Sequence, residues 1–407
     1  MKIRSITVFT HPGWPLDEAA LARAGRLVGA AREAFESAGY TVQTSRLATP
    51  PFPSFLPEAA TAPDYAQKLE NAAKPHGFDY VSIGPAMPEA PGSYAVIPEV
   101  LAATQNLFVA ATIASAGGGL NLAAIRASAR VIGRTAQITP DGFTNLRFAA
   151  LANVPPGSPF FPAAYHQPQA RSGDKPAFAL ATEAADLAVE AVTGAGSLAS
   201  ARARLVDAVE SHAQTLTRVG ERLRDEFEAE FSGVDFSLAP FPEEAISIGA
   251  AMERLGIPAV GKHGSLTAAA FLTEAIDRAD FRRVGFSGLF LPVLEDPVLA
   301  ARASKSLSVN EILLYSAVCG TGLDTIPLPG DTSEEQIAAV LLDLAALAQR
   351  LDKPLTARLM PIPGKAAGDP IHFDFAYFAD SRVLSLNAAP LGGIFTGDET
   401  IAIKPRN

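Results

Sequence analysis

Short apolar runs with strand character alternate with helical segments from the start of the chain. Residues 3–9 form the first such run, residues 17–38 repeat apolar side chains at helical spacing, and residues 40–45 return to strand character. The same order recurs in residues 80–83, 97–103, 108–113 and 120–129. Alternation of this kind is typical of parallel strands joined by crossover helices, so we expect an α/β fold.

The rest of the chain continues this pattern and adds one long helical stretch. Further strands are expected in residues 178–181, 235–239, 288–294, 323–326 and 356–360. Residues 183–232 have helical character, with an interruption around residues 194–196. About ten strands are too many for a small open sheet. We therefore expect one domain over residues 1–407, with possible halves at 1–182 and 183–407.

Composition excludes several classes of protein. The 407 residues carry a net charge of −10, from 43 acids and 33 bases, and the bases form no run, so nucleic-acid binding is disfavoured. The single cysteine excludes an intrachain disulfide framework and a thiolate zinc cluster. No apolar run approaches the roughly 20 residues that cross a bilayer, so we expect a cytoplasmic protein without a membrane partner. Neither a Rossmann nor a P-loop glycine motif is present, so no nucleotide cofactor is indicated.

Polar and glycine-rich residues follow several of the expected strands. They occupy residues 82–88, 115–121, 235–240 and 261–267. In parallel α/β folds, ligands bind at the carboxyl ends of the strands. We therefore expect these loops to converge on one pocket.

Residues 319–335 place the only cysteine, three glycines, two prolines and four acids in one short connection. Glycine and proline give such a loop special and stiff geometry, and we expect it to reach into or over the centre of the fold. Asp324 and Asp331 are hard oxygen donors suited to Mg²⁺ or Ca²⁺. Alternatively, Asp324 ends a strand and Asp331 caps the helix expected in residues 338–351, for which residues 332–335 fit a capping box.

Three further side chains are candidates for proton transfer or nucleophilic attack. Cys319 follows an apolar run, where a lone cysteine is more often a small buried hydrophobe than a nucleophile. His166 lies in a proline-rich loop and His263 follows Lys262. Each histidine is either a general base or an exposed loop residue, and the same alternatives hold for His11.

Charged residues also occur next to strongly apolar segments. Glu295 and Asp296 end the apolar residues 285–294, where unpaired carboxylates are costly to bury without a metal or a base. Arg358 lies inside an expected strand, and Lys365 follows a proline-rich turn. Arg358 and Asp296 form either an internal ion pair or part of a functional site.

Long motifs spread over the chain resemble those of the bacterial and archaeal family called domain of unknown function 711. They are residues 12–17 (PGWPLD), 153–166 (NVPPGSPFFPAAYH), 239–244 (APFPEE), 286–296 (FSGLFLPVLED), 322–332 and 358–365 (RLMPIPGK). The resemblance covers essentially the whole chain. It implies a ten-stranded α/β barrel similar to pyruvate formate-lyase and ribonucleotide reductase, with mainly parallel strands and outer helices. It implies no activity.

The barrel resemblance raises the possibility of radical chemistry, which the sequence disfavours. The C-terminal residues lack an Arg-Val-x-Gly-Tyr glycyl-radical motif, and Cys319 has no partner cysteine with which to exchange electrons. Since fold does not carry function, the chemistry has to be inferred from the side chains.

The side chains indicate metal-assisted acid–base chemistry, namely hydrolysis, elimination or isomerisation of a small anionic substrate. The candidate ligands of a divalent cation, Mg²⁺ or Ca²⁺, are Asp324, Asp331, Glu295 and Asp296. The candidate catalytic residues are His166, His263, Lys365, Arg358 and Cys319. The alternatives are a non-catalytic binding protein for a small acidic metabolite, and a cysteine or radical-type enzyme. We expect a homo-oligomer, a dimer or larger, because outer helices can pair subunits.

Overall fold

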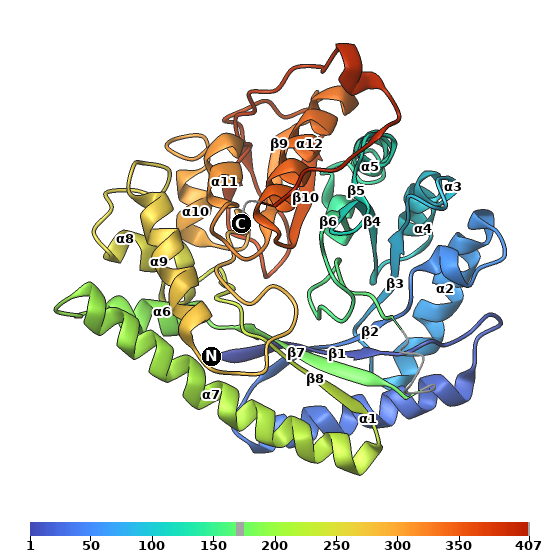
Figure 1. Cartoon of the computed structure of the whole chain (residues 1–407), viewed down its shortest axis with the longest axis horizontal. Coiled ribbons are helices and arrows are strands. Elements are labelled where there is room, and N and C mark those ends of the chain that lie inside the picture. Colours follow the sequence, from blue (N-terminus) through green and yellow to red (C-terminus); the bar gives the residue numbers. More distant parts are fainter. Residues whose placement is uncertain (168–174, 406–407) are drawn as a thin grey trace.

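The computed structural model describes residues 1–167 and 175–405 and has a mixed α/β fold built on one large 11-stranded sheet (Figure 1). Two short strands, β11 and β12, pair separately. The strands are β1 (Lys2–Phe9), β2 (Val42–Ala48), β3 (Tyr80–Ala86), β4 (Leu107–Ser115), β5 (Gly119–Asn121), β6 (Phe148–Ala152), β7 (Ala177–Glu183), β8 (Glu230–Asp235), β9 (Gly322–Pro329), β10 (Leu355–Ile362), β11 (Pro370–Ile371), β12 (Ser381–Arg382) and β13 (Thr400–Ile401).

The sheet consists of two groups of parallel strands that run in opposite directions. Its order is β8-β7-β1-β2-β3-β4-β6-β10-β9, with β5 and β13 added beside β4. Strands β1, β2, β3, β4 and β6 are mutually parallel. Strand β7 is antiparallel to β1 and parallel to β8, while β10 is antiparallel to β6 and parallel to β9. The amino ends of the first group therefore lie on the same side as the carboxyl ends of the second.

Residues 283–293 run between the edge strands β8 and β9. Three isolated parallel bridges connect them: Val234 with Arg283, Leu238 with Leu289, and Pro292 with Asp324. The expected strand at residues 288–294 is thus present only as single bridges. Proline has no N–H to donate, and Gly285 has a φ of +68°, so a regular ladder cannot continue through this segment.

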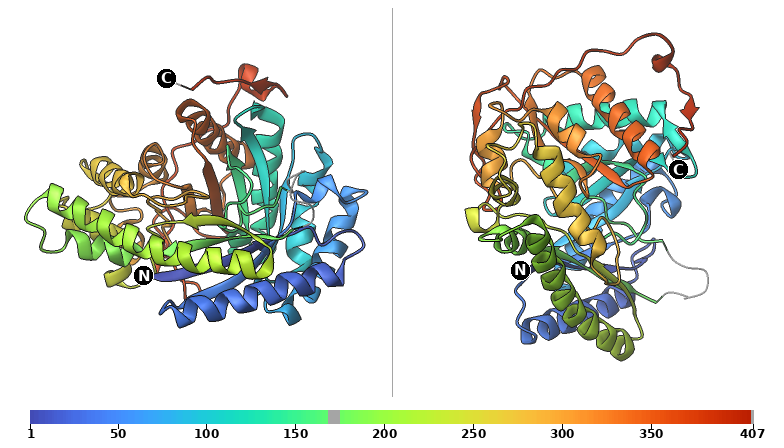
Figure 2. Two further views of the ribbon diagram at one scale, coloured as in Figure 1. Left: turned by 60° about the horizontal axis from the view of Figure 1, so that its bottom comes forward. Right: turned by 60° about the vertical axis from the view of Figure 1, so that its left-hand side comes forward.

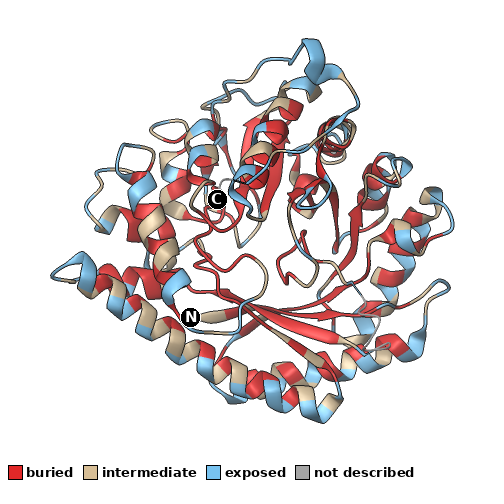
Figure 3. Ribbon diagram, in the orientation of Figure 1, coloured by how far each residue is buried: buried red, intermediate tan, exposed pale blue. Residues whose placement is uncertain are grey.

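The helices lie on the outside of the strands (Figures 1 and 2). They are α1 (Glu18–Ser37), α2 (Ala62–Ala73), α3 (Gly92–Ala95), α4 (Ile97–Ala103), α5 (Leu122–Thr135), α6 (Ala185–Val192), α7 (Leu198–Phe227), α8 (Ile248–Arg254), α9 (Ser265–Arg278), α10 (Pro297–Arg302), α11 (Val309–Tyr315) and α12 (Glu334–Leu351). The strands are almost entirely buried, and the helices expose only their outer faces (Figure 3). Within the described residues, no helix is long and apolar enough to span a membrane.

Helix α1 illustrates how the sequence forms this outer layer. Asp17 caps it, because its carboxylate accepts hydrogen bonds from the backbone N–H groups of Ala19 and Ala20. The buried side chains recur at helical spacing and face the sheet: Ala20, Leu21, Ala24, Leu27, Val28, Ala31 and Phe35. The interruption expected around residues 194–196 is confirmed, since it separates α6 from α7.

Residues 153–166, between β6 and β7, cross the inner face of the sheet. The Thr7 hydroxyl donates to the carbonyl of Pro159 at 3.1 Å, and the Ser82 hydroxyl donates to that of Ala164 at 2.8 Å. Phe160 and Phe161 are buried in this segment. It therefore fills part of the space that the curved sheet encloses and forms one wall of the candidate site.

Several local expectations are corrected by the structure. The strand expected at residues 323–326 is confirmed as part of the buried strand β9, but β9 extends over residues 322–329, so this part of the glycine- and proline-rich segment is not a loop over the centre. Helix α12 is capped one residue later than expected, by Ser333 with Gln336, whose side chains bond each other's backbone N–H groups. Strand β8 ends at Asp235, where the expected strand begins, and β6 was not anticipated, although Pro140, Asp141 and Gly142 give a turn signal before it.

Candidate functional site

A small cavity of about 140 Å³ lies against the inner face of the sheet and is lined by charged and aromatic side chains. We name it the arginine chamber, after Arg4, Arg46 and Arg358, which line it together with Glu295. Arg4 comes from β1, Arg46 from β2 and Arg358 from β10, while Glu295 lies two residues after the segment 283–293. Its aromatic lining is Tyr80, Phe108, Phe143, Phe160, Phe161, Phe375 and Tyr377.

Strand geometry explains why arginines point into this space. Successive side chains of a strand face opposite sides of the sheet. In β1 the alternation shifts at an irregularity between Ile3 and Ser5, so that Ile3 and Ile6 both belong to the main hydrophobic cluster while Arg4 faces the chamber. In β2, Leu47 belongs to that cluster and Arg46 faces the chamber. The outer face is thus apolar beneath the helices, and the inner face carries charge.

Glu295 links two of the arginines. Arg4 Nη2 contacts one of its carboxylate oxygens, and Arg358 Nη2 donates to the other at 3.0 Å. Burial acts to raise the pKa of Glu295, but Arg4 and Arg358 outweigh it and hold that pKa below its ordinary value. Both oxygens of Glu295 are therefore held in an ionised, fully paired state.

Asp324 holds the guanidinium of Arg358 in place. Its Oδ1 accepts a hydrogen bond from Arg358 Nε at 2.7 Å and lies 2.6 Å from Nη2. Burial raises the pKa of Asp324 although Arg358 opposes the shift, and the nearby charge of Glu295 raises it further. Asp324 does not line the chamber, so it positions Arg358 and contacts no ligand space itself.

Arg46 has no carboxylate partner within the described residues. Its side chain is 8% exposed, and its Nε donates to the Thr44 hydroxyl at 2.9 Å, the one hydrogen bond found for this guanidinium. The rings of Phe161 and Tyr80 lie 5.1 Å and 5.9 Å from its guanidinium carbon. Burial lowers the pKa of Arg46 to about 9, the positive charges of Arg4 and Arg358 act in the same direction, and Tyr80 and Glu295 oppose the shift only in part. This cation is therefore poorly compensated.

Arg147, a fourth arginine of the lining, is bound differently. Its guanidinium donates to the backbone carbonyls of Leu101, Thr104 and Leu107 and to the Thr104 hydroxyl, at 2.8–3.3 Å. It holds the end of α4 against the start of β4. Its hydrogen-bonding capacity is thus largely occupied by the protein, in contrast to that of Arg46.

The chamber continues into a wider outer vestibule of about 750 Å³. Both spaces are lined by Gln43, Thr44, Tyr80, Gln105, Asn106 and Tyr377. Apart from Tyr377, which lies between β11 and β12, these residues lie toward the amino ends of β2, β3 and β4. The expected convergence of strand exits on one pocket is wrong: residues 82–88 leave the first group of strands at one end, and residues 235–240 leave the second group at the other.

The predicted site residues are distributed over several places. Glu295, Asp324 and Arg358 meet at the chamber. Asp296, the next residue after Glu295, instead caps α10 and accepts hydrogen bonds from the backbone N–H groups of Val298 and Leu299. Asp331 is exposed beyond the end of β9. Within the described residues, no group of three or more His, Cys, Asp or Glu side chains is arranged to hold a metal ion.

The remaining candidates lie away from the chamber. His166 is beside the carboxyl ends of β1 and β2, where its backbone N–H donates to the Thr49 carbonyl at 2.9 Å, and burial, then His11, lowers its side-chain pKa to about 4. His263 is exposed in the turn before α9. Cys319 is buried, and its Sγ accepts a hydrogen bond from the backbone N–H of Gly322 at 3.3 Å.

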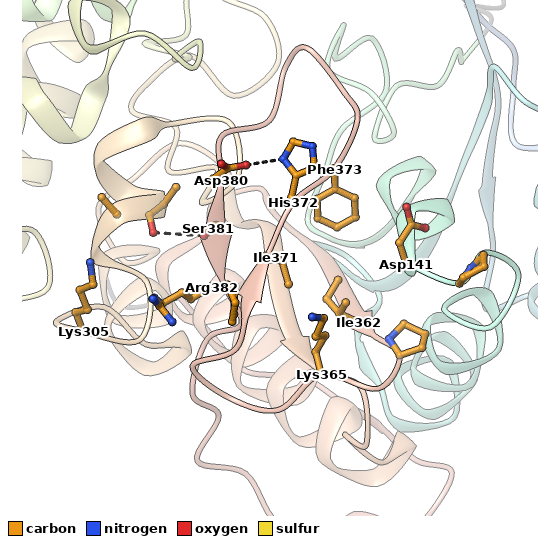
Figure 4. A pocket seen from close by; sticks show the side chains of 15 residues that line it. Asp141, Lys305, Ile362, Lys365, Ile371, His372, Phe373, Asp380, Ser381 and Arg382 are labelled. Carbon is orange, nitrogen blue, oxygen red and sulfur yellow. Dashed lines mark hydrogen bonds and ion pairs between the residues drawn. The ribbon is translucent and has the colours of Figure 1, made fainter.

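Lys365 lines a separate, open cavity of about 640 Å³ (Figure 4). Lys305 and Arg382 also line it, and His372 lies beside Asp380, with Nδ1 2.6 Å from the carboxylate oxygen. These side chains are exposed, apart from the partly covered cavity floor, so solvent screens their charges. The buried charges of the chamber act at lower dielectric, which makes the chamber the stronger candidate site.

Sequence reasoning missed Arg4 and Arg46. Arg4 lies in the strand expected at residues 3–9, whereas Arg46 directly follows the strand expected at residues 40–45, which in the structure extends to Ala48. The signal that singled out Arg358, a cation inside an apolar strand, is also present at both positions. From the sequence of one strand alone, however, an arginine on an edge strand of the sheet cannot be told from an arginine on a central strand. Only the strand order, which places β1 and β2 mid-sheet, distinguishes them.

Comparison with known proteins agrees with the sequence motifs. Residues 1–379 match the family described as Uncharacterised ACR (DUF711). Relatives named UPF0210 protein include one from Pyrobaculum aerophilum, 36% identical over 81% of this chain and 76% of the relative. Others are from Pyrobaculum arsenaticum, 34% identical over 85% and 79%, and Oenococcus oeni, 30% identical over 86% and 81%. Neither name describes a reaction or a ligand. The chain therefore belongs to the DUF711 (UPF0210) family, as its motifs predict.

Proposed function

We propose that the protein binds a small anionic molecule in the arginine chamber. The observation that carries this proposal is Arg46, a buried guanidinium that faces a cavity and has no carboxylate partner within the described residues. Burying a cation without a counter-charge is strongly unfavourable. An anion in the chamber would supply the missing charge and hydrogen-bond acceptors.

A purely structural role explains Arg46 less well than it explains its neighbours. Arg4 and Arg358 each pair with Glu295, so their burial is compensated within the fold. Arg46 gains only the Thr44 hydrogen bond and ring contacts with Phe161 and Tyr80. Perturbed charges that line a cavity are typical of functional sites.

The proposal includes closure of the sheet into a ten-stranded barrel. Residues 283–293 would form the tenth strand, between β8 and β9, with the three isolated bridges as its pairing. Support also comes from Asp235, whose carboxylate accepts hydrogen bonds from the N–H groups of Phe286 and Ser287 at 3.0 Å and 2.8 Å and so holds this segment beside β8. The two opposed groups of five strands would then enclose the chamber, in keeping with the resemblance to pyruvate formate-lyase.

The test is calorimetric titration of the purified protein with benzoate, acetate, inorganic phosphate and sulfate, for wild type and for Arg46→Met. At least one of these anions should bind the wild type, and the variant should bind it about 100-fold more weakly, since a charge-assisted bidentate contact is lost. Arg382→Met, which removes an exposed arginine from the other cavity, is the matched control and should bind like the wild type. Anion binding that survives Arg46→Met would place the site elsewhere and reject the proposal.

Acid–base turnover of the bound anion is the second candidate. It is favoured by Glu295, a carboxylate that lines the chamber and is kept ionised by Arg4 and Arg358, as a proton acceptor has to be. Hydrolysis, elimination and isomerisation fit it, and NMR spectra of each bound anion during incubation with enzyme would detect conversion. Assistance by Mg²⁺ or Ca²⁺ and a homodimeric or larger assembly remain predictions.

A further inference from the structure

We propose that the ligand of the arginine chamber is a flat, singly charged carboxylate with an aromatic body. This inference rests on the proposed function and narrows it to a class of ligand. It combines three properties of the chamber: the number of uncompensated charges, the orientation of the free guanidinium, and the chemistry of the walls.

The charge balance of the chamber fits a monoanion. Four guanidinium groups line the chamber, those of Arg4, Arg46, Arg147 and Arg358. Glu295 and Asp324 pair with Arg4 and Arg358, and Arg147 donates its hydrogen bonds to backbone carbonyls and the Thr104 hydroxyl. Within the described residues, Arg46 is thus the positive charge of the lining whose donors are open to a ligand. A singly charged carboxylate neutralises it, whereas a phosphate dianion would bring an excess negative charge close to the buried Glu295.

The orientation of Arg46 favours a planar acceptor. Aromatic rings lie over its guanidinium, with Phe161 at 5.1 Å and Tyr80 at 5.9 Å, so the flat face is covered. Its Nε edge is occupied by the Thr44 hydroxyl. The edge formed by Nη1 and Nη2 remains, and two parallel N–H groups in one plane match the two oxygens of a carboxylate.

The walls around this edge are aromatic rather than polar. Tyr80 packs against Phe108 with ring centroids 5.2 Å apart, and Phe108 packs against Phe161 at 5.4 Å, both edge-to-face. Phe160 closes the adjoining side beneath Arg358, whose guanidinium carbon lies 5.5 Å from its ring. Such walls stabilise a ring through offset or edge-to-face contacts. At about 140 Å³ the chamber is smaller than the roughly 300–1,000 Å³ of sites for drug-sized ligands, so a flat body fits better than a bulky one.

The mouth of the chamber agrees with this orientation. Gln43, Gln105 and Asn106 offer neutral amide groups where the chamber opens into the vestibule. The vestibule acids are already bound: Glu70 accepts from the backbone N–H of Gln105, and Asp79 pairs with Arg32. A ligand would thus place its carboxylate inside on Arg46 and its ring along the aromatic walls, with any polar substituent at the amides.

Four probes test this class by calorimetry: benzoate, cyclohexanecarboxylate, benzyl alcohol and inorganic phosphate. Cyclohexanecarboxylate keeps the charge but not the flat ring, and benzyl alcohol keeps the ring but not the charge. We expect benzoate to bind about tenfold more tightly than each of the other three, the size of effect expected from aromatic contacts and one ion pair. Phe161→Leu, which keeps the wall apolar, should reduce the preference for benzoate over cyclohexanecarboxylate.

The outcomes separate this inference from the proposed function. If cyclohexanecarboxylate or phosphate binds as tightly as benzoate and still depends on Arg46, the ligand class is wrong while anion binding in the chamber stands. If Phe161→Leu leaves the benzoate preference unchanged, the aromatic walls do not select the ligand and the class is again wrong. If none of the anions binds in a way that Arg46→Met weakens, both the class and the proposed function are rejected.

Discussion

Glu295 and Asp296 are consecutive buried carboxylates with opposite surroundings. Asp296 accepts hydrogen bonds from the N–H groups of Gly249, Val298 and Leu299 and from the Ser247 hydroxyl, at 2.8–3.1 Å. Glu295 is held by guanidinium groups at the edge of a cavity. Asp296 is enclosed by the fold, while Glu295 belongs to a network that contains a cation without a carboxylate partner in the described part of the chain. Burial alone therefore does not mark a functional carboxylate; the partner groups do.

Asp235 resembles Asp296, because both are buried carboxylates held by neutral hydrogen-bond donors. Its partners are the N–H groups of Phe286 and Ser287 and the hydroxyl of Ser237, and no cation is among them. A Cβ at Gly285, which has φ +68°, would lie 2.2 Å from the Asp235 carboxylate, so glycine is required for this approach. Asp235 and Asp296 fix the positions of backbone segments, whereas the chamber leaves charge available to a ligand.

The difference between the paired and the unpaired charges is tested most directly by making the same substitution at Arg358 and at Arg46. Arg358→Met leaves Glu295 and Asp324 buried with a lost partner, so the free energy of unfolding should fall by about 3–5 kcal/mol. Arg46→Met strands no carboxylate and removes a poorly compensated buried cation, so it should leave the free energy of unfolding unchanged or raise it. Urea unfolding followed by circular dichroism measures both. Equal losses in the two variants would mean that Arg46 is as structural as Arg358.

The pH dependence of the free energy of unfolding should reveal the ionisation of Asp235. Burial, against the opposing hydrogen bonds, raises the pKa of Asp235 to about 6, from 3.8 when unfolded. Because the folded pKa is the higher one, this group's contribution is fully present below pH 3.8 and is lost as pH rises through about 6. Across that window the loss amounts to about 3 kcal/mol.

Urea unfolding of wild type and Asp235→Asn from pH 4 to 7 measures this contribution as a difference. The asparagine does not ionise, so the wild type should lose stability relative to the variant as pH rises. The exposed Asp331→Asn serves as the control for a changed carboxylate elsewhere. A wild-type-minus-variant difference that stays constant over this range would show that Asp235 is ionised throughout, and that its hydrogen bonds outweigh burial.

Cys319 is another buried polar group, and it should behave like Asp235 and Asp296, which the fold encloses. Its thiol packs beneath β9 and accepts one backbone hydrogen bond, so Cys319→Ala should lower the free energy of unfolding by about 1 kcal/mol through a small cavity. A thiol reagent such as DTNB should react with it only in urea. Rapid reaction of the native protein would indicate access from solvent and return Cys319 to the list of candidate nucleophiles.

The sequence predicts the elements of this fold better than the site they form. Periodicity located α1, the break between α6 and α7, and the strands β1, β9 and β10, because each has a local signal. The glycines and prolines of residues 319–335 suggested a loop around the strand expected at residues 323–326, yet residues 322–329 are a buried strand that pairs with β10 on one side. Arg358 and Glu295 were found as charges in or beside apolar runs, and Asp324 was found as a candidate metal ligand. Their meeting with Arg46 depends on long-range strand order, which no local pattern contains.

Asp331 is exposed, unlike the other carboxylates compared above, and its substitution should have the smallest effect on the free energy of unfolding. It was a candidate for both a metal ligand and a helix cap, but the cap is Ser333, and Asp324 on the same strand is engaged by Arg358. Asp331→Asn should therefore change the free energy of unfolding by less than about 0.5 kcal/mol. Titration with Mg²⁺ and Ca²⁺ should give the same heats for wild type and variant. Metal binding that disappears in Asp331→Asn would instead show that an exposed carboxylate, outside the chamber, is part of the working site.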